Sequence, residues 1–79
     1  MKIYTYIDND LMKTDEVTLL IKNKKELLHL REFIDLCILL IENNKFEHEH
    51  LSDFLHAKKY KLSSSEFIIA KAPKQVKKR

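Results

Sequence analysis

The side chains most able to do chemistry are gathered in one short stretch in the middle of the chain. They are Glu47, His48, Glu49, His50, Asp53 and His56. Imidazole and carboxylate groups are metal ligands, and a His-x-His spacing puts two imidazoles on one face of an extended segment. The stretch matches no specific metal motif, because it defines no third and fourth ligand at a suitable spacing. We therefore expect no purpose-built metal site and no cofactor.

Hydrolytic chemistry is a second interpretation of the same stretch. Ser52 together with the neighbouring histidines and Asp53 supplies the residue types of a catalytic triad. Crowded into seven residues, 50–56, they can hardly form the nucleophile–base–orienter line that the mechanism requires. Glycine is absent from the chain, which excludes the Gly-rich phosphate loop and the G-x-S-x-G nucleophile elbow. We expect that the protein is not an enzyme.

The length and composition indicate one small globular domain. The chain has 79 residues, of which 44% are apolar and 34% charged. A single cysteine excludes an internal disulfide and fits a reducing compartment. The longest apolar run, residues 36–41, is far shorter than the roughly 20 residues of a membrane span. The N-terminus lacks the pattern of a signal peptide, so we expect a cytoplasmic protein that does not contact a membrane.

The net charge of +3 is distributed unevenly along the chain. Residues 71–79 carry five of the 15 basic side chains and no acidic one, so residues 1–70 hold ten basic against 12 acidic side chains, a net charge of −2. We expect a single domain over residues 1–72 and a basic, disordered tail over 73–79. Three lysines and a tyrosine at 58–61 resemble a patch that follows a nucleic-acid backbone, which leaves a nucleic-acid-associated regulator as an alternative.

Periodicity predicts three strands and one long helix. Alternating apolar residues predict strands over residues 2–7 and 16–21, joined as an antiparallel hairpin, and a last strand over 66–70. Asn23 is the expected N-cap of the helix, with Glu26 reaching back as in a capping box, and residues 43–44 are the expected stop. Residues 46–56 are expected to form an irregular segment or a short helix.

The expected helix carries two apolar stripes, and one sheet can cover only one of them. The stripe expected to face the sheet consists of Leu27, Leu30, Ile34, Cys37, Ile38 and Ile41. The second stripe consists of Phe33, Leu36 and Leu40. We expect this second stripe to pack partly on residues 46–55 and partly on a second copy of the chain, which makes it a candidate homodimer face.

The order of these segments resembles a family of small bacterial immunity proteins from polymorphic toxin systems. The resemblance covers roughly residues 1–70 and lies in E-V-T-L at 16–19, the apolar helix that follows, F-x-H-E-H at 46–50 with Asp53 behind it, and E-F-I-I at 66–69. It implies a non-catalytic antidote that binds a cognate toxin.

Together these observations predict an α+β fold, a small β-β-α-β domain in which an antiparallel hairpin and a C-terminal strand pack on one long helix. The predicted function is neutralisation of a protein toxin by occlusion. The candidate contact residues are the acidic and histidine side chains near the end of the helix, which would suit a basic partner. They are Glu42, Glu47, His48, Glu49, His50 and Asp53.

Overall fold

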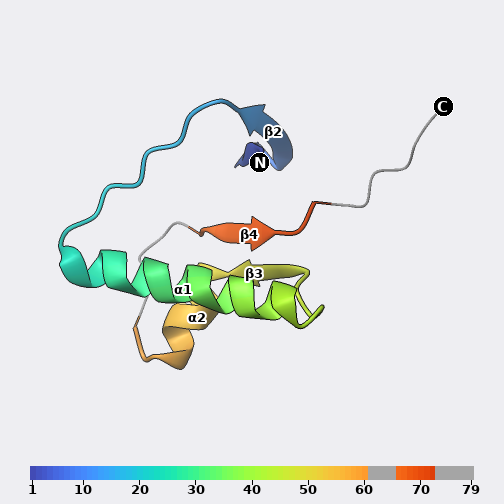
Figure 1. Ribbon diagram of the computed structural model, residues 1–79. Coiled ribbons are helices and arrows are strands. Elements are labelled where there is room, and N and C mark those ends of the chain that lie inside the picture. The colour runs from blue at the N-terminus through green and yellow to red at the C-terminus, as the bar shows by residue number, and fades with distance from the viewer. Residues whose placement is uncertain (61–65, 73–79) are drawn as a thin grey trace.

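The fold is α+β, with two small antiparallel sheets and two helices. The computed structural model describes residues 1–60 and 66–72, so the basic tail predicted at 73–79 lies outside the described residues. The elements follow the order β1 (Ile3–Ile7), β2 (Asp10–Thr14), α1 (Lys24–Glu42), β3 (His48–His50), α2 (Leu51–Ala57) and β4 (Ile68–Ala70) (Figure 1). β1 pairs with β2, and β3 pairs with β4. An N-terminal antiparallel hairpin, a long helix and a C-terminal strand are present, as the predicted fold class requires.

The N-terminal hairpin forms with a different second strand from the one predicted. Asp8 and Asn9 have φ of 51° and 70°, the left-handed values of a two-residue hairpin turn. Such a turn pairs Ile7 directly with Asp10, so the five residues after the turn form β2. The predicted strand over 16–21 is therefore wrong in this structure, because the tight turn uses nearer residues as the partner of β1.

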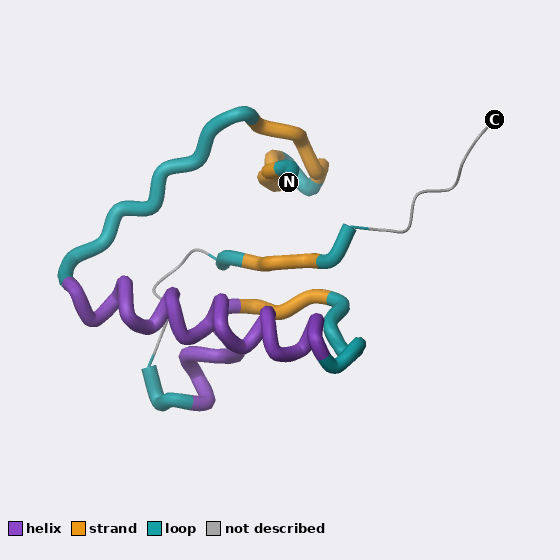
Figure 2. The backbone as a smooth tube through the Cα atoms, viewed as in Figure 1, coloured by secondary structure: helices purple, strands orange, loops and turns teal. Residues whose placement is uncertain are grey.

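Residues 15–23 instead connect the hairpin to α1 as a long loop (Figure 2). Their apolar side chains remain largely in solvent: Val17, Leu19 and Ile21 are about half exposed, and Leu20 is 93% exposed. The β-branched and alternating composition of this loop is typical of a strand, yet the loop has no strand partner within residues 1–60 and 66–72.

Both predicted ends of α1 are confirmed. The Asn23 side chain accepts a hydrogen bond from the Glu26 amide at 3.1 Å, and Glu26 accepts one in return from the Lys22 amide at 2.7 Å. At the other end, Asn43 caps the helix and Asn44 takes a left-handed φ of 56°. No helix in the described part of the chain combines the length and apolarity needed to cross a membrane.

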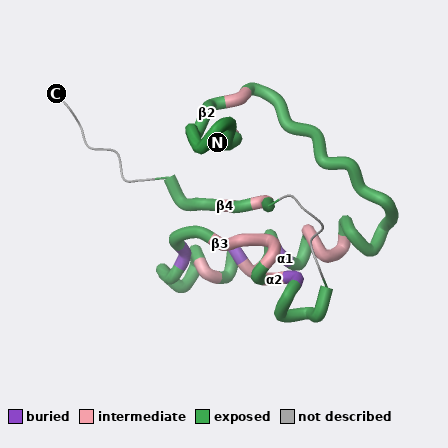
Figure 3. Tube along the Cα trace, turned by 180° about the vertical axis from the view of Figure 1, so that it is seen from behind, coloured by how far each residue is buried: buried purple, intermediate pink, exposed green. Residues whose placement is uncertain are grey.

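The core lies where α1 meets α2 and the β3–β4 sheet. Its centre is Phe33, which is 0% exposed, together with Cys37 and Phe46. The Phe33 ring contacts two other aromatic rings, Phe54 at 5.6 Å and Phe67 at 6.4 Å between centroids. Among residues 1–60 and 66–72, the buried side chains are confined to this region, whereas the hairpin and residues 15–23 are mostly exposed (Figure 3).

The domain buries the stripe of α1 that was predicted to face a second copy, and it leaves most of the other stripe exposed. Phe33 and Leu40 belong to the core, and Leu36 is partly buried, so the predicted homodimer face is the inner face of the domain. Most of the stripe expected to face the sheet is in solvent, with Leu27, Ile34, Ile38 and Ile41 at 40–53% exposure. Only Leu30 and Cys37 of that stripe reach the core.

Aromatic packing explains the reversal. The Phe33 ring fits between Phe54 of α2 and Phe67, the residue before β4, so it sets the rotation of the helix about its axis. Ile34 then lies about 100° around the helix from Phe33, outside the contact. Packing of the second stripe on residues 46–55, the other part of the prediction, is confirmed by Phe46, Leu51 and Phe54 in the core.

This rotation of α1 predicts opposite outcomes for two adjacent substitutions. Phe33→Ala should lower the free energy of unfolding by about 3–5 kcal/mol, because it opens a cavity at the centre of the core. Ile34→Ala should cost less than about 1 kcal/mol, because its side chain is 40% exposed. Urea denaturation followed by circular dichroism measures both, with Phe33→Leu as a milder variant that remains folded. Equal losses for the two positions would contradict the assigned helix face.

Candidate functional site

The outer face of the β3–β4 sheet presents two histidines side by side. His48 and His50 alternate with Glu49 along β3, so their rings share one face and lie 5.4 Å apart between centroids. The register pairs them with Ala70 and Ile68 of β4, which places all four side chains on the same face. We call these four residues the outer face.

Glu49 belongs to the opposite side of the sheet. It pairs with Ile69, whose side chain packs against the core. Its charge also acts on the buried Cys37: burial raises the pKa of the Cys37 thiol, and the nearby Glu49 raises that pKa further. Cys37 therefore stays a protonated, buried thiol, as expected for a core residue.

Glu66 is the residue that ties this region together, and the sequence analysis missed its role. Its Oε1 accepts hydrogen bonds from the amides of Ser52 at 3.0 Å and Phe67 at 2.9 Å. Its Oε2 accepts a short hydrogen bond from the Ser52 hydroxyl and lies 3.2 Å from Nδ1 of His50. One carboxylate thus connects β3, α2 and the start of β4.

The position of Glu66 also supplies a cap for α2. His50, the N-cap residue of α2, makes no side-chain capping bond, so the first amides of the helix need other acceptors. The Leu51 amide donates to the Phe67 carbonyl at 2.8 Å, and the Ser52 amide donates to Glu66. A capping residue 14 positions away in sequence gives no local signal, so the sequence analysis could not find it.

The four hydrogen bonds change the acidity of Glu66. Desolvation, the largest single effect, raises the pKa of Glu66, but the combined bonds from Ser52, Phe67 and His50 outweigh it and lower the pKa to about 2. In this arrangement the Ser52 hydroxyl donates its hydrogen bond to the Glu66 carboxylate and not to the His50 imidazole. A triad needs the histidine between serine and acid, so the order Ser–Glu–His supports anchoring and not nucleophilic activation.

The other predicted contact residues do not gather at one point. Glu42 ends α1 and Glu47 precedes β3, near the loop that joins these elements, while Asp53 lies in the first turn of α2 beyond the far end of β3. All three are exposed. Within residues 1–60 and 66–72, no group of three or more His, Cys, Asp or Glu side chains is arranged to hold a metal ion.

The basic patch predicted at 58–61 is partly engaged in packing. Lys58 Nζ lies 3.2 Å from Glu32 Oε1 of α1 and 5.2 Å from the centroid of the Phe54 ring. The Tyr60 ring contacts His29, also of α1, in a tilted arrangement at 4.4 Å between centroids. These contacts attach the end of α2 to α1. Residue 61 lies outside the described residues.

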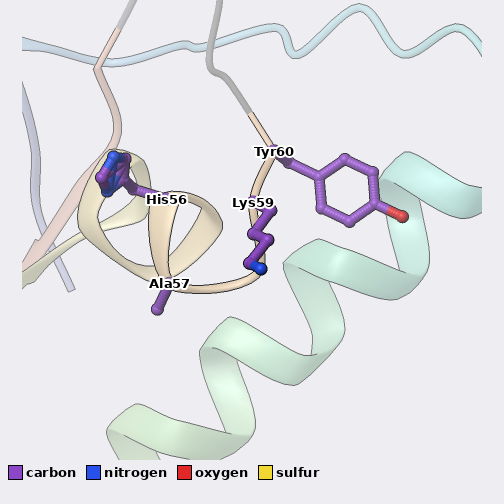
Figure 4. A pocket seen from close by; sticks show the side chains of 4 residues that line it. All are labelled: His56, Ala57, Lys59 and Tyr60. Atoms are coloured by element: carbon purple, nitrogen blue, oxygen red, sulfur yellow. The ribbon is translucent and has the colours of Figure 1, made fainter.

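A hollow at the end of α2 is lined by His56, Ala57, Lys59 and Tyr60 (Figure 4). The four side chains point in different directions, with Tyr60 toward α1 and His56 on the other side of α2. Binding sites for small molecules bring a few polar groups to a common point inside a concave pocket. This hollow lacks such convergence.

The outer face and the Glu66 anchor are therefore the best-defined candidate site in the described part of the chain. No family model, curated protein or solved structure matches this chain. The site is accordingly interpreted from its own geometry: two histidines side by side on a short sheet, His48 exposed and His50 half-buried, with His50 held by a hydrogen-bonded carboxylate.

The lowered pKa of Glu66 predicts a specific acid sensitivity. Because the folded-state pKa is about 2 against an ordinary 4.5, the ionised carboxylate stabilises the fold above pH 4.5, and this stability is lost as the pH falls toward 2. Glu66→Gln should reduce the free energy of unfolding at pH 7 by about 1 kcal/mol, a value discounted for a side chain that is 35% exposed.

Urea denaturation at a series of pH values checks this prediction. The difference between wild type and Glu66→Gln should shrink between pH 4.5 and 2. The exposed Glu47 is the matched control, and Glu47→Gln should change stability by less than about 0.5 kcal/mol at any pH. A constant difference across the pH series would show that the Glu66 carboxylate is not held in its ionised form.

Proposed function

We propose that this chain is a non-catalytic protein-binding domain, an immunity protein that neutralises a cognate bacterial toxin by covering its working surface. The observation that carries the proposal is the outer face of the β3–β4 sheet. It offers exposed polar and apolar side chains on a support that is anchored at Glu66. Occlusion requires such a presented surface, whereas catalysis requires a cleft.

The F-x-H-E-H motif supports this proposal because some of its residues are buried and others face solvent. Phe46 lies in the core at 6% exposure, while His48 is exposed on the outer face. The motif thus joins an internal anchor to side chains that face outward. Residues with this arrangement bind a partner without rearranging the core, because their backbone is already held in place.

The charge distribution supports a basic partner surface. Glu42, Glu47 and Asp53 are all exposed, and residues 1–70 carry a net charge of −2. Electrostatic complementarity of this kind increases the association rate, which favours an inhibitor that must capture a toxin quickly. Toxins that act on nucleic acid present a basic surface, which would complement the acidic side chains of this domain.

The proposal includes a cytoplasmic location, which a reduced Cys37 suits. The nucleic-acid-associated regulator has less support, because Lys58 and Tyr60 of its predicted patch contact α1. A homodimer would have to use a surface other than the one predicted, since Phe33 and Leu40 are occupied within the chain.

Co-expression tests the proposed function. The product of the open reading frame next to this chain's gene should arrest growth when it is produced alone, and this chain should restore growth. The double substitution Glu47→Lys/His48→Ala should weaken the complex by at least about tenfold, since it reverses one exposed charge and removes an exposed ring. Isothermal titration calorimetry with the purified toxin domain measures the affinity.

Two controls separate the proposal from its alternative. Asp35→Ala alters an exposed acid on α1, away from the outer face, and should leave the affinity within about twofold. Removal of residues 73–79 should also leave neutralisation unchanged, whereas a regulator would lose nucleic-acid affinity and its salt dependence. A folded, well-expressed chain that fails to restore growth would contradict the immunity proposal.

A further inference from the structure

β4 has one paired edge and one edge without a partner among the described residues. The Leu51 amide donates to the Phe67 carbonyl and the Lys71 amide to the Glu47 carbonyl, each at 2.8 Å. In an antiparallel ladder these bonds alternate, so the amides and carbonyls of Ile68 and Ala70 point away from β3. No backbone hydrogen bond joins these groups to residues 1–60 or 66–72. An edge of this kind is a template for another strand.

The chain also contains a strand-like segment without a partner, residues 16–21. Val17, Leu19 and Ile21 alternate with Thr18 and Leu20, as they would in a strand with one apolar face. The backbone groups of this segment make no backbone hydrogen bond with any described residue. Six residues of extended, β-prone and exposed chain match what an open edge of a sheet can bind.

A third unmatched surface lies along one flank of α1. Four apolar side chains occupy it at 40–53% exposure: Leu27, Ile34, Ile38 and Ile41. The opposite flank is covered, because His29 contacts the Tyr60 ring and Glu32 pairs with Lys58. In Figure 1, α2 lies on one side of α1 and β4 on the other, so the exposed flank lies away from α2.

The start of α1 keeps the segment apart from β4 of its own chain. Only Lys22 and Asn23 separate residues 16–21 from the helix, and both are held by Glu26: the Lys22 amide donates to the Glu26 carboxylate at 2.7 Å, and the Glu26 amide donates to Asn23 at 3.1 Å. These bonds set the direction in which the segment leaves α1. Along that direction it passes β4 without pairing (Figures 1 and 2).

We propose that residues 16–21 pair as an antiparallel strand with the free edge of β4 in a second copy of the chain. Residues 16–21 of the second copy pair in the same way with β4 of the first, which produces a two-fold, strand-exchanged dimer. Thr18 then lies opposite Ala70 and Leu20 opposite Ile68, so the amides of Thr18 and Leu20 bond the groups left open on β4. This register places Val17, Leu19 and Ile21 on the core side of the sheet.

The exchange satisfies all three unmatched features at once. The open backbone groups of β4 gain hydrogen bonds, the segment gains a sheet, and its apolar face meets the exposed flank of α1. Two-stranded sheets are marginally stable in water, and a third strand strengthens them. The inference does not depend on the toxin-binding proposal, because it concerns only the contacts between copies of this chain.

A proline substitution tests the backbone pairing. Thr18→Pro removes the amide that would bond Ala70 but touches no hydrogen bond of the single chain. Sedimentation equilibrium should show a wild-type dimer and a dissociation constant at least about tenfold higher for Thr18→Pro. The matched control Thr18→Val keeps the amide and should keep the dimer. Wild-type protein that is monomeric at several hundred micromolar would overturn the proposal.

Cross-linking distinguishes exchange between copies from closure within one chain. Chains carrying only Thr18→Cys are mixed with chains carrying only Ala70→Cys and treated with a short bismaleimide. Cys37 is 4% exposed, so the chain without added cysteine is the background control. Strand exchange predicts a cross-linked species that contains one chain of each kind. A chain that carries both substitutions is treated in the same way. A cross-link found only in this chain, at monomer mass, would overturn the exchange.

Discussion

The burial of Phe33 determines how the rest of the domain is arranged. Its ring lies between Phe54 of α2 and Phe67 at the start of β4, so one side chain holds together segments that are far apart in sequence. Because the ring is fully enclosed, the helix has a single rotation about its axis that satisfies the contact. The inner and outer faces of α1 follow from that rotation, including the apolar flank that remains exposed.

A polar counterpart to this packing lies at Glu66. The core is small, with few fully buried residues, and a domain of this size gains limited stability from apolar burial. The Glu66 carboxylate adds directional bonds that the core cannot supply, because it accepts hydrogen bonds from Ser52, Phe67 and His50 at once. It fixes the angle between β3 and α2, and it thereby sets the orientation of the histidine pair.

The chain leaves apolar side chains exposed outside the Phe33 core and the Glu66 anchor. Residues 16–21 and the free flank of α1 leave large aliphatic side chains in water, which costs free energy in a domain with little to spare. Contiguous apolar surface on a small soluble domain is typical of a protein-binding face. The outer face, with its histidines and surrounding acids, is of a different kind, and the two surfaces suit different partners.

The sequence by itself determined the local features of this protein. Asn23 and Glu26 define the start of α1, Asn43 and Asn44 define its end, and Asp8 and Asn9 define a turn, because caps and turns depend on residues a few positions apart. The α+β class followed from the same local patterns. The position of the second strand did not, since strand propensity at 16–21 carries no information about which segment the turn brings into register.

Only the tertiary structure decided which face of α1 is buried and which residues form the candidate site. Two apolar stripes have similar hydrophobicity, and only the rings of Phe54 and Phe67 select Phe33 over Ile34. The predicted cluster at 47–53 is divided by the sheet, because alternate residues of a strand face opposite sides. Glu66 joins that cluster across 14 positions of sequence, a distance over which side-chain pairing depends on the fold and leaves no periodic signal.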